Sequence, residues 1–342
     1  MTYNNEKPRL TNGKKASKLI RARACAALCM LLCAGSLFLF FSLSSNPIST
    51  VGDALLRLQM PFLNGSGKNA AEKTEPPVKI ELVDIDEGVG EKIRIELLNN
   101  SIPPKTSINL EGKEPRILIY HTHTTEAYTQ TDKYSYDEKG DWRTDDNTRN
   151  IVTVGEKLAT LLSEKYGISV IHDITDHEPP KLSTAYSRSV KTMEKYKSKY
   201  PSITMFIDVH RDAYDTKGRE NTDYVVIDGK RVARMMFVVG TGEGATGTGF
   251  GKMPDFQSNY ALAKSLTEYM LGINGKLMRN IRVKTGRYNQ HITNQCLLIE
   301  VGHNANTLEE SLNAVEYLAE AIAHVAGSPQ ESGVPSMLPL TP

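Results

Sequence analysis

The stretch RILIYHTHTTE, residues 116–126, decides the fold, because a short apolar run passes directly into polar groups that can bind a metal. Residues 117–120 form an unbroken apolar run, which is typical of a strand buried on both faces of a sheet. His121, His123 and Glu126 follow at once. Since open parallel sheets bind ligands beyond the carboxyl ends of their strands, this stretch predicts both a buried strand and a functional site.

Downstream of this strand the sequence alternates between helix-like and strand-like segments. Apolar residues next recur at helical spacing over 151–162, and they are followed by a strand over 168–171, a helix over 183–197 and a strand over 203–209. Strands that alternate with helices form parallel sheets covered on both sides. We therefore predict an α/β domain with an open, mostly parallel, twisted sheet and helices on both faces.

The alternation is interrupted by TDYVVIDGKRVARMMFVVG, in which two β-rich runs flank Asp228-Gly229. This dipeptide predicts a β-hairpin inserted into the domain. The glycine-rich run over 240–251 does not open a helix after a strand, so it predicts a flexible loop beside the site rather than a dinucleotide-binding turn. The remaining elements are a helix over 260–271, a strand over 296–301 and a last helix that begins at a capping box of Thr307 and Glu310.

Two more predicted strands also end in polar groups. The strand over 203–209 runs into His210-Arg211-Asp212, and the strand CLLIEVG holds Glu300 and precedes His303. Burying a glutamate in such an apolar run costs several kcal/mol unless it is paired or bound to a cation. Two imidazoles and a carboxylate would suit zinc, which keeps one position for water and lowers the pKa of that water to about 7. The strand ends therefore predict a zinc hydrolase, with a carboxylate that moves the proton.

The amino-terminal part predicts a membrane anchor. Residues 24–43 carry no charge and would span about 30 Å as a helix, whereas the apolar region of a cleaved signal peptide is usually about 7 to 15 residues. The basic segment 1–23 places the amino terminus in the cytoplasm and everything after the anchor outside. Residues 44–77 are expected to form a stalk, residues 78–114 a hairpin-like lead-in segment, and residues 328–342 a disordered tail.

Charge excludes one class of function. The net charge is +1, but the basic residues concentrate in the first 23 positions, and the rest is mildly acidic. A nucleic-acid partner would need a basic face on the folded part, so none is expected. Cys296 is the only cysteine after the anchor, and because it sits in an apolar strand it is a poor candidate nucleophile.

Four motifs in order carry a resemblance to a known family: ILIYHTHTTEAY, FIDVHRDA, RVARMMFVVGT and LLIEVGHNAN. Together they resemble the stage II sporulation protein P family of endospore-forming bacteria, over about residues 115 to 326 plus the anchor. That family is similar to the zinc N-acetylmuramoyl-L-alanine amidases, whose domain is an open α/β sheet. The resemblance therefore implies a zinc amidase-like catalytic domain over residues 115–327.

The resemblance also implies site residues. It places the zinc histidines at His123, with His121 as the alternative, and at His210, and it makes Glu300 the catalytic glutamate. The amidases take a third ligand four residues before an asparagine, which falls on Asp146 here, one methylene shorter than the usual glutamate. Glu126 competes with Asp146 for this role, and Arg211 is a candidate for binding substrate carboxylates.

The function implied is cleavage of the amide that joins N-acetylmuramic acid to L-alanine in peptidoglycan. Two alternatives stay open: a murein endopeptidase or carboxypeptidase that uses the same zinc site, and a wall-binding scaffold without catalysis. The family acts during engulfment in endospore formation, so the resemblance implies work in the septal intermembrane space alongside stage II sporulation proteins D and M.

Overall fold

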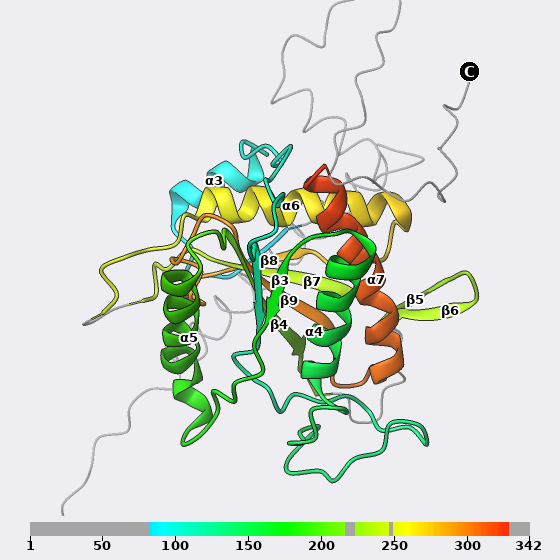
Figure 1. Ribbon diagram of the computed structural model, residues 1–342. Helices are drawn as coiled ribbons and strands as arrows, with labels where there is room; N and C mark the ends of the chain where they lie inside the picture. The colour runs from blue at the N-terminus through cyan, green and yellow to red at the C-terminus, as the bar shows by residue number, and fades with distance from the viewer. Residues whose placement is uncertain (1–82, 216–222, 246–248, 328–342) are drawn as a thin grey trace, which may run out of the picture. The chain divides into compact units, whose positions relative to one another are not determined.

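The computed structural model describes residues 83–215, 223–245 and 249–327, which belong to one compact unit of the chain, Lys79–Pro342 (Figure 1). The predicted anchor, stalk and carboxy-terminal tail lie outside the described residues, so their placement stays a prediction. Within the described ranges, no helix combines the length and the apolar character needed to cross a bilayer.

The core of the domain is a seven-stranded sheet in the order β1-β8-β7-β9-β4-β2-β3. Neighbouring strands are parallel throughout except for β7 and β9, which are antiparallel. This arrangement confirms the mostly parallel sheet. The strands are β1 (Val83–Ile85), β2 (Ile117–Tyr120), β3 (Val170–His172), β4 (Met205–Asp212), β7 (Met235–Gly240), β8 (Ile281–Lys284) and β9 (Cys296–His303).

Helices cover both faces of this sheet, as the sequence predicts (Figure 1). Along β2, Ile117 and Ile119 pack into the large apolar core with α4 (Ile151–Thr160), α6 (Phe256–Ile273) and α7 (Leu308–Val325). The alternate residues Leu118 and Tyr120 pack with Met193 of α5 (Ala185–Lys199) on the other face. Because side chains alternate along a strand, one apolar run serves two cores.

Turns of other helical types adjoin α4 and α5, and a capping box starts α7. The helix α4 continues into one π-helical turn, η2 (Leu161–Lys165), and a short 3-10 turn, η3 (Leu182–Thr184), precedes α5. At the start of α7 the Thr307 side chain accepts from the Glu310 amide while the Glu310 carboxylate accepts from the Thr307 amide. This confirms the predicted capping box.

The lead-in segment differs from its prediction. Residues 83–85 form β1, but KIRIELL lies in a helix, α3 (Glu91–Leu98), so the hairpin-like lead-in is wrong. Helix-forming Glu, Lys, Arg and Leu outweigh the apparent alternation. Strand β1 instead pairs with β8, which is almost two hundred residues away in the sequence. No local sequence pattern predicts this pairing.

The inserted hairpin is confirmed. Strands β5 (Tyr224–Ile227) and β6 (Lys230–Ala233) pair antiparallel, and Asp228 and Gly229 both have positive φ, 49° and 75°, as the two-residue turn requires. It projects from the domain beside α7 (Figure 1). After Ala233 the same β-rich run enters the middle of the main sheet as β7, so the second run is two strands rather than one.

Candidate functional site

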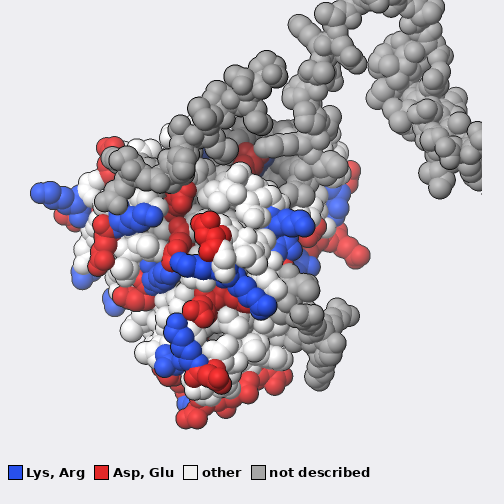
Figure 2. All heavy atoms as spheres, turned by 90° about the vertical axis from the view of Figure 1, so that its right-hand side faces the viewer, with Lys and Arg blue, Asp and Glu red and all other residues white. Residues whose placement is uncertain are grey.

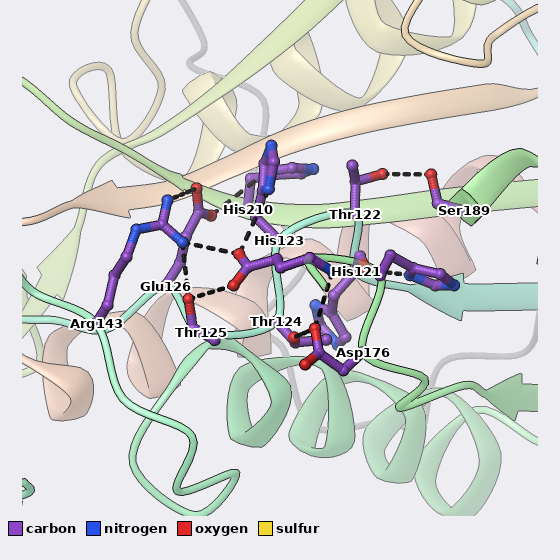
Figure 3. A network of polar contacts seen from close by, with 12 residues as sticks. His121, Thr122, His123, Thr124, Thr125, Glu126, Arg143, Asp176, Ser189 and His210 are labelled. Atoms are coloured by element: carbon purple, nitrogen blue, oxygen red, sulfur yellow. Dashed lines mark hydrogen bonds and ion pairs between the residues drawn. The ribbon is translucent and has the colours of Figure 1, made fainter. Parts of the chain in front are cut away.

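The carboxyl ends of β2 and β4 bring His123, Glu126 and His210 together (Figure 3), and Glu300 lies on the neighbouring strand β9. His210 and Glu300 are opposite each other in the β4–β9 register. The rings of His123 and His210 have centroids 5.4 Å apart, and Oε2 of Glu126 lies 3.4 Å from Nδ1 of His210. Segments separated by up to 177 residues of sequence thus meet because neighbouring parallel strands end at one edge.

The structure separates the two acidic residues that competed for the third ligand position. Glu126 is buried beside His210. Asp146 is exposed, and its Oδ1 accepts hydrogen bonds from the amide and the hydroxyl of Thr148. A short carboxylate two residues before a threonine readily closes such a local turn. The position of Asp146 therefore does not support it as a ligand, whereas that of Glu126 does.

The two histidines of the first motif also have different surroundings. His121 is fully buried; its Nδ1 lies 2.9 Å from the Val209 carbonyl and its Nε2 lies 3.0 Å from Nε2 of His172. Burial, and to a lesser extent the nearby His172, lower the pKa of His121 to about 3. Both ring nitrogens of this neutral imidazole are therefore already engaged.

Opposite charges surround His210. Its Nε2 lies 2.9 Å from Oδ1 of Asp208. Oδ1 of Asp208 accepts a hydrogen bond from the Thr122 amide, and Oδ2 accepts one from the Thr122 hydroxyl. Burial alone would lower the pKa of His210, but the carboxylates of Asp208 and Glu126 raise it well above its usual value. Burial would likewise raise the pKa of Glu126, but the charge and hydrogen bonding of His210, together with the nearby Arg211 and His123, outweigh burial and hold that pKa at about 2.

Glu300 behaves in the opposite way. Burial raises its pKa from 4.5 to about 8; the charge of His210 opposes this shift, and that of Glu126 adds to it. Its Oε2 atom is shielded from solvent and has no hydrogen-bond partner among the described residues. A carboxyl group with this pKa can both hold and release a proton near neutral pH.

Two observations bear on a metal ion. Nδ1 of His123 is buried without a hydrogen-bond partner in the described part of the chain, and such an atom costs about 1–3 kcal/mol unless something binds it. The 3.4 Å between Glu126 and His210 equals the spacing of about 3.4 Å between two ligands of a tetrahedral zinc ion. As placed, however, no three His, Cys, Asp or Glu side chains of the described residues form a complete metal-binding group. The donor types fit zinc, and His123, which faces Glu178 at 3.4 Å, is the ligand that would have to turn.

Comparison with known protein families identifies the family to which this chain belongs. The family model of stage II sporulation protein P (SpoIIP) matches residues 54–323. The chain belongs to this family. Stage II sporulation protein P of Bacillus subtilis strain 168 is 26% identical over 271 residues, which are 75% of this chain and 62% of that protein. The chain thus matches less than two thirds of the length of this relative, and the resemblance drawn from the four motifs is confirmed.

Solved structures that resemble the chain are N-acetylmuramoyl-L-alanine amidases. AmiC2 of Nostoc punctiforme is 17% identical and covers 63% of this chain and 97% of its own, with a TM-score of 0.36. The catalytic domain of CwlV from Bacillus (Paenibacillus) polymyxa var. colistinus is 15% identical and covers 61% and 95%, also with a TM-score of 0.36. TM-scores this low do not establish a shared fold.

Several residues around this family's motifs were not predicted. Arg143 donates from Nη1 to Glu178 and to Thr125, both at 2.7 Å, and its Nη2 lies 3.9 Å from Glu126 (Figure 3). Asp208 carried a usable signal, because an aspartate within the apolar strand MFIDV resembles Glu300 in its own strand. Arg143 and Glu178 lie in loops without periodicity, so the sequence offered no comparable signal for them.

Arg211 does not have the place predicted for it. Its side chain is buried, with Nε donating to the Ala127 carbonyl at 2.8 Å and Nη2 donating to the Trp142 carbonyl at 2.9 Å. Its amide also donates to Glu126 at 3.1 Å. The guanidinium therefore holds the loop that carries Glu126 rather than facing a substrate. Cys296 is as expected for a structural residue, since burial raises its pKa.

Proposed function

We propose that the chain is a zinc-dependent peptidoglycan hydrolase that cleaves the N-acetylmuramoyl-L-alanine amide bond. The observation that carries this proposal is the convergence of His123, Glu126 and His210 beside Glu300 at one edge of the sheet. Membership of the SpoIIP family supports it, because the resemblance links that family to zinc amidases.

The residues that would hold zinc are His123, Glu126 and His210. Two imidazoles and one carboxylate are the ligand types of catalytic zinc sites with three protein ligands. When bound, zinc would lower the pKa of a water molecule to about 7 and polarise the scissile carbonyl. Asp208 would fix the orientation of the His210 ring, since buried carboxylates commonly orient metal-binding imidazoles.

Glu300 would transfer the proton. Its shielded carboxyl group lies opposite His210 in the sheet, and it would take a proton during attack on the amide and then give it to the departing amine. An amine is a poor leaving group until it is protonated, so this transfer is needed for the bond to break.

Digestion of purified peptidoglycan followed by mass spectrometry tests the proposal. An amidase releases intact stem peptides and leaves free lactyl ends on the glycan. The variant Glu300→Gln keeps the size of the side chain and should abolish digestion, while the surface variant Glu309→Gln should digest normally. Digestion by Glu300→Gln at the parental rate would refute the role of Glu300.

The products also distinguish the alternatives. Shortened or uncrosslinked stems would indicate an endopeptidase or carboxypeptidase, and binding without any product would indicate a scaffold. We further propose the cellular setting that the resemblance implies: anchoring through residues 24–43, an external catalytic domain, and action with stage II sporulation proteins D and M during engulfment. Membrane fractionation of sporulating cells, with protease added from outside, tests the anchor and its orientation.

A further inference from the structure

A cavity of about 410 Å³ lies beside the candidate catalytic residues. Its walls come from the start of α5, the end of the glycine-rich loop and the segment that follows β8. Three aromatic rings, Tyr186, Phe250 and Tyr288, and one cation, Arg287, line it.

Tyr186 connects this cavity to the catalytic side chains. Its ring stacks on His210 at 6.5 Å between centroids, and it meets the ring of His123 edge-on at 5.8 Å. Tyr186 also meets the ring of Tyr288 edge-on, with 5.7 Å between the ring centroids. One ring thus separates the residues proposed to hold zinc from a hollow large enough for several atoms of substrate.

Arg287 gives the cavity its charge. Its guanidinium lies 4.4 Å from the centre of the Phe250 ring, and its Nη1 donates to the Gly249 carbonyl at 2.9 Å. Its Nε and Nη2 atoms have no hydrogen-bond or ion-pair partner among the described residues. Stacking on a ring fixes the plane of a guanidinium, and a fixed plane with free donors suits bidentate binding of a carboxylate.

Two further cavities lack this combination. One of about 720 Å³, beside the β5–β6 hairpin and α7, contains Lys133 and Arg231, which are paired with Glu309 and Glu310. Figure 2 shows this side of the molecule, where Lys and Arg alternate with Asp and Glu. Neither this cavity nor the one of about 380 Å³ beside α3 is lined by a predicted catalytic residue or by Tyr186.

We propose that the cavity beside Tyr186 binds the peptide arm of the substrate and that Arg287 pairs with a carboxylate of that peptide. This inference rests on the proposed function. The two sides of the scissile amide differ in charge, because the glycan consists of uncharged N-acetylated sugars whereas the stem peptide carries free carboxylates. A cation with free donors complements the peptide, and the tyrosine faces pack against its aliphatic groups.

Calorimetric binding to the full chain carrying Glu300→Gln tests this, since no turnover is needed. The probes are N-acetylmuramoyl-L-alanyl-D-glutamate and the same molecule with its glutamate carboxyls converted to amides. The acid should bind about tenfold more tightly than the amide, and Arg287→Gln should remove that preference. Equal binding of acid and amide by the Glu300→Gln chain, with Arg287 intact, would overturn the inference.

Matched variants guard against a general loss of structure. Arg287→Lys keeps the charge and should retain part of the preference. Arg231→Gln removes a guanidinium that also lies 4.4 Å from an aromatic ring, that of Tyr224, and should leave both affinities unchanged. If Arg287→Gln weakened acid and amide equally, the pairing would be refuted. If binding depended on Arg287 but the wild-type chain released no product, the proposed hydrolysis alone would fail.

Discussion

Two histidines only two positions apart, His121 and His123, have contrasting environments. His121 lies under α4 with both ring nitrogens engaged, and a Cβ at Gly155 would approach its Nε2 to 2.6 Å. His123 faces His210 with a buried Nδ1 that has no hydrogen bond in the described residues. The first is equipped to hold strand and helix together and the second to bind a ligand, so the number of unused donors and acceptors distinguishes them where sequence spacing does not.

The largest expected effect is on hydrolysis. His123→Ala should reduce kcat/KM by about a thousandfold, because a missing metal forfeits several kcal/mol of transition-state stabilisation. His121→Asn should retain activity within about tenfold and instead destabilise the fold by about 1–3 kcal/mol through lost buried hydrogen bonds. Rates of dye release from labelled peptidoglycan measure the first effect and chemical denaturation the second. Equal losses of activity in His123→Ala and His121→Asn would show that the two histidines do not differ in function.

Glu126 and Asp146 differ in the same way: one is placed to bind a metal ion and the other is engaged in a local turn. Glu126→Gln should weaken zinc affinity by about a hundredfold or more, because an amide is a much poorer ligand than a carboxylate in a three-residue site. Asp146→Asn should leave zinc affinity unchanged, since its carboxylate bonds Thr148. Competition with a chromogenic chelator measures both. A loss confined to Asp146→Asn would restore the original assignment.

The tight packing over His121 can be tested without touching a polar group. Gly155→Ala should destabilise the fold by about 1–3 kcal/mol, because its methyl group would also meet His172 at 2.8 Å. Gly272→Ala lies in α6 with nothing within 4 Å and should be neutral or stabilising by up to about 1 kcal/mol. Urea denaturation of both variants provides the comparison. Similar stabilities would mean that α4 can move away from the histidines.

The last prediction concerns how stability depends on pH through the carboxyl group of Glu300, opposite His210. The pKa of Glu300 is raised to about 8 in the fold, so between pH 4.5 and 8 the unfolded chain releases a proton that the folded chain keeps, and stability falls as pH rises. In metal-free protein, Glu300→Gln should therefore be more stable than the parent above about pH 8 and should lose this advantage below about pH 4.5. Thermal unfolding across pH measures it. A gap that widened toward low pH would contradict the assigned shift.

The sequence predicted much of this because its signals were local or followed from the sheet. Apolar runs marked β2, β4 and β9, and the polar residues after them had to meet because parallel strands end at a common edge. Asp228-Gly229 and the Thr307 capping box are chemical signatures of a turn and a helix start, and both are confirmed.

What the sequence could not supply depends on distant contacts. The pairing of β1 with β8 joins residues almost two hundred positions apart. The apolar residues of KIRIELL alternate as they would in a strand, although this segment forms the helix α3. The choice between Glu126 and Asp146 required knowing which loop folds back on His210. Arg211 carried the right charge for a substrate, but only the structure shows that the Ala127 and Trp142 carbonyls already use it.

The central claim is that His123 and His210, and not His121, hold a zinc ion. Elemental analysis of the full chain after dialysis against a weak chelator tests it most directly. We predict about one zinc ion per chain for the parent and for His121→Asn, and far less for His123→Ala and His210→Ala. A His123→Ala protein that kept the parental zinc content, or a parent that bound none after zinc was supplied, would contradict it.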